Sequence, residues 1–142
     1  MKKPYLGVWV DHTQAHLIWL DEQGDAELQY TRVQEGEAAQ KSDLTMSGAS
    51  GVYGGLAPHA TAEDKRRQRA KRLYDRLIKA MSPARHVYIF GPGLARKELH
   101  KRIEQHKDAA GKVTGVDAAE KMTEAQMVAH VKAVFELPRP PM

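Results

Sequence analysis

The sequence contains no cysteine, which excludes disulfide bonds, thiolate zinc sites and cysteine nucleophiles. The absence agrees with a reducing compartment. The apolar run near the N-terminus ends at Asp11, so it is too short for the apolar region of a signal peptide. No segment approaches the roughly 20 apolar residues that a membrane-spanning helix needs. We therefore expect a cytoplasmic location.

What the sequence does contain is typical of one globular domain. It has 142 residues, of which 42% are hydrophobic and 28% charged. We predict a single domain over residues 1–136, with a long mobile loop at about 34–60 and a frayed tail at 137–142. The loop is rich in Gly, Ser, Ala and Gln, and a connection of that length is either functional or disordered. A plain surface insertion stays an open alternative.

Hydrophobic periodicity predicts an α/β protein with the element order β-β-β-α-β-α-β-α. Consecutive hairpin strands are antiparallel, whereas strands joined through a helix pair in parallel with right-handed crossovers. We therefore predict a three-layer α/β/α fold around a mixed five-stranded sheet ordered 3-2-1-4-5, with strand 2 antiparallel to the rest. This pattern resembles a ribonuclease-H-like motif. The expected strands are 5–11, 16–20, 26–33, 86–90 and 112–117, and the expected helices are 61–80, 94 to about 106, and one from 123.

Local patterns also predict which faces of these elements are buried. The strand at 26–33 alternates apolar and polar residues, which is typical of a half-buried strand. Thr61 is suited to cap the first helix, and Thr123 with Gln126 forms a capping-box pattern at the third. The positions expected to face the core are Ala62, Leu73, Leu77 and Met81 in the first helix, Leu94, Ala95, Leu99 and Ile103 in the second, and Val128, Val131, Val134 and Phe135 in the third.

The strongest functional signal is positive charge in the first helix. Residues 61–80 carry eight Lys or Arg and three acids, a net +5, so the rest of the +4 chain sums to −1. Charge runs are usually solvated helix faces, but a concentrated positive field beside a Gly-rich loop indicates a polyanion, RNA above all. We expect phosphate contacts from the face that holds Lys65, Arg69, Arg72, Arg76 and Lys79.

The Gly-rich loop adds to this hypothesis. Gly54 and Gly55 would let RNA approach the backbone closely, and Tyr53 and His59 could stack on unpaired bases. The predicted partner is therefore ribosomal or other structured RNA.

Three segments carry a resemblance to a known family: VWVDHTQAHLIW at 8–19, IFGPGLARKELHKRI at 89–103 and KMTEAQMVAHVKAVF at 121–135. With them the chain resembles the small bacterial translational machinery proteins. Those are similar to the central domain of archaeal and eukaryotic peptide-chain release factors and of Pelota. The resemblance implies that the loop before the basic helix corresponds to the Gly-Gly-Gln loop. In release factors that loop enters the peptidyl-transferase centre, where its glutamine assists peptidyl-tRNA hydrolysis.

This chain departs from the release factors at the decisive position. It has Gly54-Gly55-Leu56, and a leucine side chain has no hydrogen-bonding group with which to position water. The 142 residues also leave no room for codon-reading and partner-binding domains. We therefore expect a stand-alone, non-enzymatic RNA-binding domain without cofactor or metal, and no release activity.

Three alternatives remain open. Asp11, His12 and His16 form a D-H-x-x-x-H pattern, which suits either a metal site of a hydrolase or nuclease or plain polar contacts of a hairpin. The two histidines share strand parity, but the turn between them can break that register. The segment Gly91-Pro92-Gly93 suits either a phosphate-binding turn or a tight connection from strand to helix. The third alternative is a protein-interaction module whose long loop orders on a partner.

Overall fold

The computed structural model describes residues 3–32 and 61–137. The expectations about the loop at 34–60 and about most of the tail therefore lie outside the described residues. Within the described part, no helix is long and apolar enough to cross a membrane.

The predicted sheet is confirmed. Five strands form one sheet in the order β3-β2-β1-β4-β5. β2 is antiparallel to both of its neighbours, whereas β4 runs parallel to β1 and to β5. The strands are β1 (Tyr5–Val10), β2 (Gln14–Leu20), β3 (Ala26–Arg32), β4 (His86–Gly91) and β5 (Val113–Ala118).

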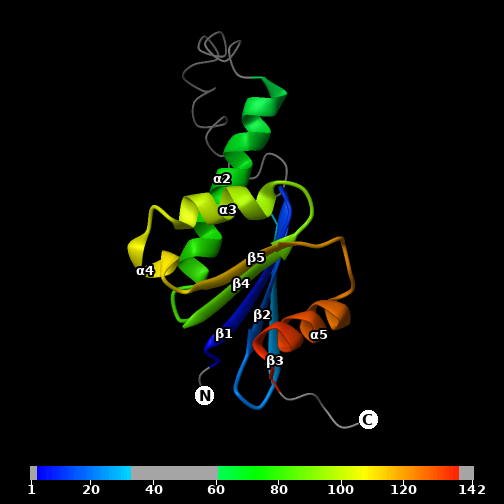
Figure 1. The fold of residues 1–142 in the computed structure, drawn as a ribbon. Coiled ribbons are helices and arrows are strands. Elements are labelled where there is room, and N and C mark those ends of the chain that lie inside the picture. The colour runs from blue at the N-terminus through cyan, green and yellow to red at the C-terminus, as the bar shows by residue number, and fades with distance from the viewer. Residues whose placement is uncertain (1–2, 33–60, 138–142) are drawn as a thin grey trace.

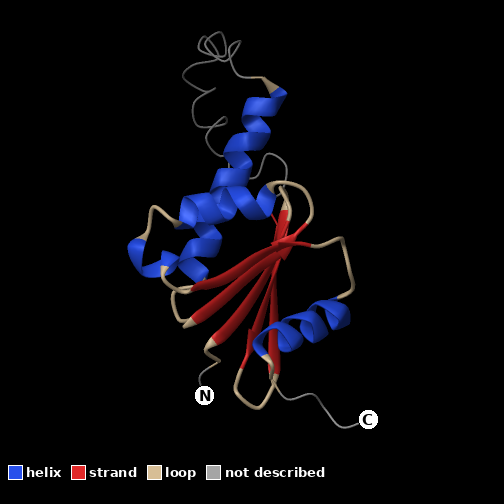
Figure 2. Cartoon of the chain, viewed as in Figure 1, coloured by secondary structure: helices blue, strands red, loops and turns tan. Residues whose placement is uncertain are grey.

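Helices cover both faces of this sheet (Figures 1 and 2). Helices α2 (Ala62–Ala80) and α3 (Ala95–Ile103) pack on one face, and α5 (Glu124–Phe135) packs on the other. α3 is shorter than predicted, because the amides of Gln105 and His106 bond carbonyls three residues back and the backbone of His106 is extended. A single turn, α4 (Lys107–Ala110), follows.

The central strands are buried on both faces because successive side chains of a strand alternate. Val8 of β1 joins Leu73, Leu77 and Leu99 in the core under α2 and α3. Its neighbour Trp9 joins the second core, which contains Ile18, Leu20, Tyr88, Phe90, Met127 and Val131. The sheet is therefore the middle layer of three.

The prediction that the third strand is half-buried is wrong. β3 is almost fully exposed, with Leu28 at 39% and Tyr30 at 50%. The reason is position: β3 is the edge of the sheet, whereas α5 packs over β1 and β2, and α3 over β1, β4 and β5. Alternation along the chain does not reveal whether a helix covers the strand.

Some expected core positions are also exposed. Ala62 is exposed because the core contacts of α2 start at Ala70. Leu94 is 59% exposed because it caps α3 and lies outside its inner face. Val134 is 38% exposed, whereas the buried positions of α5 are Met127 and Val131.

Candidate nucleic-acid interface

The N-terminus of α2 is held by interactions within the helix itself. The hydroxyl of Thr61 accepts a 3.0 Å hydrogen bond from the Asp64 amide, and the Asp64 carboxylate accepts one of 3.1 Å from the Thr61 amide. These two bonds, followed by the charge of Arg67, lower the pKa of Asp64. Arg67 also donates to Glu63 at 3.0 Å, one helical turn back. The cap predicted at Thr61 is thus a full capping box with Asp64, which satisfies amide groups that would otherwise lack partners.

The first part of α2 extends beyond the sheet (Figure 1). None of the residues from Ala62 to Arg69 is buried, and the first buried position is Ala70. We call residues 62–69 the projecting half. At a rise of about 1.5 Å per residue it is about 12 Å long. It presents its surface to the surroundings from several sides.

The positive charge of the projecting half is not confined to one stripe. It carries Lys65, Arg66, Arg67 and Arg69. Because successive helical residues are about 100° apart, Lys65, Arg66 and Arg67 point in three different directions. A helix that is polar all round has no face to bury in its own domain, so this segment suits contact with a charged partner.

The second half of α2 is anchored to the domain. Leu73, Tyr74 and Leu77 are buried against the sheet and α3. Arg72 and Lys79 are exposed beside them. Arg76 is exposed as well, but its Nη1 donates a 3.1 Å hydrogen bond to Thr31 Oγ1 of β3. Arg76 therefore also helps to hold the edge strand.

The acidic residue Asp75, in the second half of α2, is neutralised by an ion pair. Asp75 accepts two hydrogen bonds from Arg102 of α3, at 2.6 and 3.0 Å. These bonds are the main cause of the lowered pKa of Asp75. Its charge is balanced locally, so it does little to weaken the positive field of the helix.

The glycines predicted to line the interface lie outside the described residues, together with Leu56, Tyr53 and His59. In the sequence, Gly54 and Gly55 lie a few positions before the cap residue Thr61.

The structure does not bring the residues of the metal hypothesis together. Asp11 Oδ1 accepts 2.8 Å hydrogen bonds from the amides of Thr13 and Gln14 and so closes the β1–β2 turn. His12 Nε2 lies 3.2 Å from Glu98 of α3, whereas His16 Nδ1 lies 3.5 Å from Glu124 of α5. These helices cover opposite faces of the sheet. Over residues 3–32 and 61–137 no group of three or more His, Asp or Glu could hold a metal ion.

The Gly91-Pro92-Gly93 segment has a backbone explanation. Gly91 has φ of +151°, and a Cβ atom there would lie 2.2 Å from the carbonyl oxygen of Val10. Gly93 has φ of +63°, in the region that favours glycine. Its carbonyl accepts a hydrogen bond from Arg96. These features favour the tight connection from β4 to α3.

Sequence reasoning missed two polar networks that join distant parts of the chain. In the first, the buried Tyr74 hydroxyl donates a 2.7 Å hydrogen bond to Glu98, which also contacts His12. Burial, followed by this bond, raises the pKa of Tyr74. The network fixes α2 relative to α3 and the β1–β2 turn. No sequence signal links its members, because they are brought together only by the packing of the helices.

The second network lies on the other face. Tyr88 donates to Asp117 at 2.8 Å and lies 3.1 Å from His130 Nε2. Burial and the bond to Asp117 raise the pKa of Tyr88. Because the Tyr88 side chain is only 2% exposed, its hydroxyl acts as a link between β4, β5 and α5.

This fold is similar to that of an archaeal protein of known structure. The crystal structure of the archaeal translation termination factor aRF1 matches this chain with a TM-score of 0.53 and 16% sequence identity. The match covers 93% of this chain and 39% of the length of the archaeal factor. The chain thus has the fold of a release-factor domain. No protein-family model matches the sequence, and no curated protein matches it significantly.

Proposed function

We propose that this chain is a translation-associated domain that binds ribosomal or other structured RNA through α2 and the adjacent Gly-rich segment with Gly54 and Gly55. The observation that carries the proposal is the projecting half, which combines positive charge on several sides with the absence of any buried residue. The release-factor-like fold supports the association with translation. Residue by residue, the expected phosphate contacts are Lys65, Arg69, Arg72, Arg76 and Lys79.

A projecting, cationic helix suits RNA for a physical reason. Structured RNA surrounds a bound element with phosphates, and each contact between a cation and a phosphate releases counterions. The face with Lys65, Arg69, Arg72, Arg76 and Lys79 would supply these contacts, and Arg66 adds positive charge on another side of the projecting half.

We further propose that the chain is not an enzyme and needs neither metal nor cofactor. By the resemblance of the sequence, Leu56 corresponds to the catalytic glutamine of release factors, and a leucine side chain cannot hydrogen-bond water. Nor does the geometry favour a metal-dependent hydrolase or nuclease, because His12 and His16 contact helices on opposite faces. The cytoplasm is the location that fits an RNA-binding role.

The test is RNA binding by fluorescence anisotropy, with a labelled ribosomal RNA hairpin as the probe. Non-specific affinity is expected in the micromolar range or weaker, with a steep salt dependence. In the test variant Lys65, Arg69 and Arg72 are all changed to Gln, a good helix former. We expect affinity to fall at least about tenfold and the salt slope to fall by about two to three, as three lost phosphate contacts require. Arg76 is left intact because it bonds Thr31.

The matched control removes three positive charges elsewhere. Lys101, Lys107 and Lys121 are exposed and lie on α3, on α4 and before α5. Changing these three to Gln lowers the net charge equally and is expected to cost much less affinity. If the wild type binds no RNA at low salt, or if both triple variants lose affinity equally, the proposed interface is wrong.

A further inference from the structure

The outer side of β3 is an open edge of the sheet (Figure 1). β2 pairs with the inner side of β3, and within residues 3–32 and 61–137 no strand pairs with the outer side. β3 pairs with β2 along its whole length without a bulge, and it contains no proline. Bulges and prolines are among the features by which natural proteins keep an edge strand from pairing with another chain. The edge of β3 is therefore regular enough to accept a further strand.

The hydrogen-bond pattern shows which backbone groups of β3 point outward. The Asp21 amide donates a 3.1 Å hydrogen bond to the Asp25 carbonyl, just beyond the pair formed by Leu20 and Ala26. Successive residues of an antiparallel strand bond alternately to one side and to the other. The odd-numbered residues of β3 therefore bond β2, whereas the amides and carbonyls of the even-numbered residues point to the open side. The even-numbered residues are Ala26, Leu28, Tyr30 and Arg32.

Two of these even-numbered residues also expose large apolar side chains, Leu28 and Tyr30. The Tyr30 ring packs against His16, with ring centroids 4.8 Å apart, and its hydroxyl donates a 2.6 Å hydrogen bond to Gln14 Oε1. The ring is thus already oriented, so a partner that packs on it does not have to order it first. The open edge offers unpaired backbone groups and apolar surface together.

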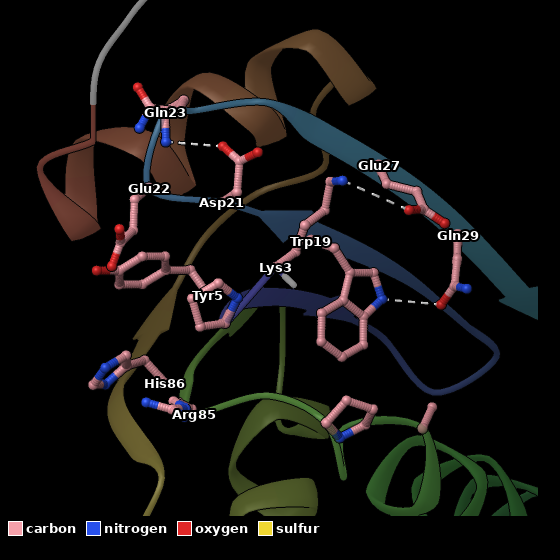
Figure 3. Close-up of a pocket in the computed structure, with 13 residues that line it drawn as sticks. Lys3, Tyr5, Trp19, Asp21, Glu22, Gln23, Glu27, Gln29, Arg85 and His86 are labelled. Carbon is pink, nitrogen blue, oxygen red and sulfur yellow. Dashed lines mark hydrogen bonds and ion pairs between the residues drawn. The ribbon is translucent and has the colours of Figure 1, made fainter. Parts of the chain in front are cut away.

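The side of β3 that faces α2 carries opposite charges at its two ends. Near the start of the strand, Glu27 lies 4.0 Å from Lys3, a contact that Figure 3 shows as a dashed line. This ion pair is weak, because the Glu27 side chain is 62% exposed. Near the end of the strand, the exposed Arg76 donates its 3.1 Å hydrogen bond to Thr31. Two antiparallel copies of this side would bring unlike charges together.

We propose that β3 pairs antiparallel with β3 of a second copy of this chain, so that the two sheets join into one. A two-fold axis at Gln29 places even-numbered residues opposite even-numbered residues. The open amides and carbonyls of the two edges then bond one another. In such an interface the same surface is used by both copies, so each contact occurs twice.

The side chains favour a second copy because β3 is complementary to itself in this register. Leu28 lies opposite Tyr30 of the second copy, which removes apolar surface of both from water. On the side that faces α2, Glu27 lies opposite Thr31 of the second copy. Glu27 is therefore beside the Arg76 that bonds this threonine, and a charge-assisted hydrogen bond joins them. An unrelated strand would have to supply both features.

The first test measures the mass and the amide exchange of the wild-type chain, without RNA, over a range of protein concentrations. Sedimentation equilibrium should show a monomer–dimer equilibrium with a micromolar dissociation constant, because the interface of one strand pair is small. The amides of Leu28 and Tyr30 should become protected from exchange as the concentration rises. Those of Gln29 and Thr31 should be protected in the monomer too, because they bond β2.

Three results of this test would overturn the proposal. The first is a monomer at every concentration up to the millimolar range. The second is a dimer in which the amides of Leu28 and Tyr30 still exchange freely, since another surface would then form it. The third is protection of these two amides in the monomer, which would mean that another part of this chain pairs with β3.

A matched pair of variants tests the surface. Lysine on an edge strand opposes pairing, so Leu28→Lys should raise the dissociation constant of the dimer at least about tenfold. Leu94 is also an exposed leucine, and it follows β4, which β1 and β2 separate from β3. Leu94→Lys should leave the dissociation constant within about twofold of the wild-type value. Equal effects of the two changes would show that β3 is not the interface.

Charge reversal tests the register. Glu27→Arg and Arg76→Glu should each weaken the dimer at least about fivefold, because each places like charges beside one another across the axis. The double variant Glu27→Arg/Arg76→Glu restores unlike charges and should dimerise within about twofold of the wild type. A strand that is merely destabilised would not recover in this way. If the double variant dimerises no better than the single variants, the proposed pairing is wrong.

Discussion

Arg102 of α3 holds Asp75 of α2 through two hydrogen bonds, from Nε to Oδ1 at 2.6 Å and from Nη2 to Oδ2 at 3.0 Å. A two-point contact between guanidinium and carboxylate fixes direction as well as distance. The pair therefore helps to set the position of α2 over the sheet, and with it the direction in which the projecting half points.

The first prediction concerns the pH dependence of this pair. The pKa of Asp75 is lowered from its ordinary 3.8, so the pair's contribution to stability is complete above pH 3.8 and is lost as pH falls through the lowered pKa. Because both groups are partly exposed, Arg102→Gln should cost less than about 1 kcal/mol at neutral pH. In urea titrations the difference from wild type should be equal at pH 7 and 5 and smaller near pH 3. A difference that grows with acid would contradict the assignment, and Lys101→Gln is the control.

The second prediction compares two capping boxes of the same design. Thr61 caps the projecting half, and Thr123 caps α5, which buries Met127 and Val131. Each change to Ala removes a cap that contributes about 1 kcal/mol. Thr61→Ala should speed amide exchange in residues 62–69 by roughly fivefold while the global free energy of unfolding stays nearly constant. Thr123→Ala should lower the global free energy of unfolding. Equal global losses would show that the projecting half is part of the cooperative core.

The third prediction concerns the contact between β1 and α5. A Cβ atom at Gly7 would lie 2.3 Å from Val131 Cγ2, so Gly7→Ala pushes α5 away from the sheet. Overpacking of this kind costs about 1–3 kcal/mol, measurable by urea unfolding. Gly111 is the control, because its nearest contact would be Lys107 O at 3.9 Å and Gly111→Ala should be nearly neutral. RNA binding by Gly7→Ala should be unchanged, since α2 lies on the opposite face; a loss would count against the proposed interface.

The fourth prediction is the absence of peptide release. On the proposed correspondence of Leu56 with the catalytic glutamine of release factors, the purified protein should not hydrolyse peptidyl-tRNA on ribosomes loaded with labelled formylmethionyl-tRNA. A complete release factor serves as the positive control. Release above the buffer background by the wild-type chain would refute the proposal that it is not an enzyme.

Much of the fold is predictable from the sequence, because its determinants are local. The apolar run at 86–90 and the Gly91-Pro92-Gly93 turn identify β4 and its exit into a helix. The exposure of β3 is not determined by its local sequence, since it depends on where α5 packs. The one-turn helix α4 was missed because the residues after Ile103 continue the helical composition although the backbone of His106 is extended.

The candidate interface was predictable in part. The positive charge of α2 and the cap at Thr61 can be predicted from the sequence. A signal for the projecting half was present too, because no apolar residue lies between Ala62 and Ala70. The hydrogen bond from Arg76 to Thr31 could not be predicted, because it requires knowing that α2 runs alongside an edge strand 45 positions away in sequence.

The projecting half also has a consequence for how the chain tolerates change. Large losses of stability come from buried positions, and exposed substitutions usually have small effects. Residues 62–69 contain no buried position, so their charges can be added, removed or exchanged with little effect on whether the domain folds. The buried positions from Ala70 onward, such as Leu73 and Leu77, have no such freedom. The charge of residues 62–69 can thus be adjusted without compromising the packing that holds the rest of the helix on the sheet.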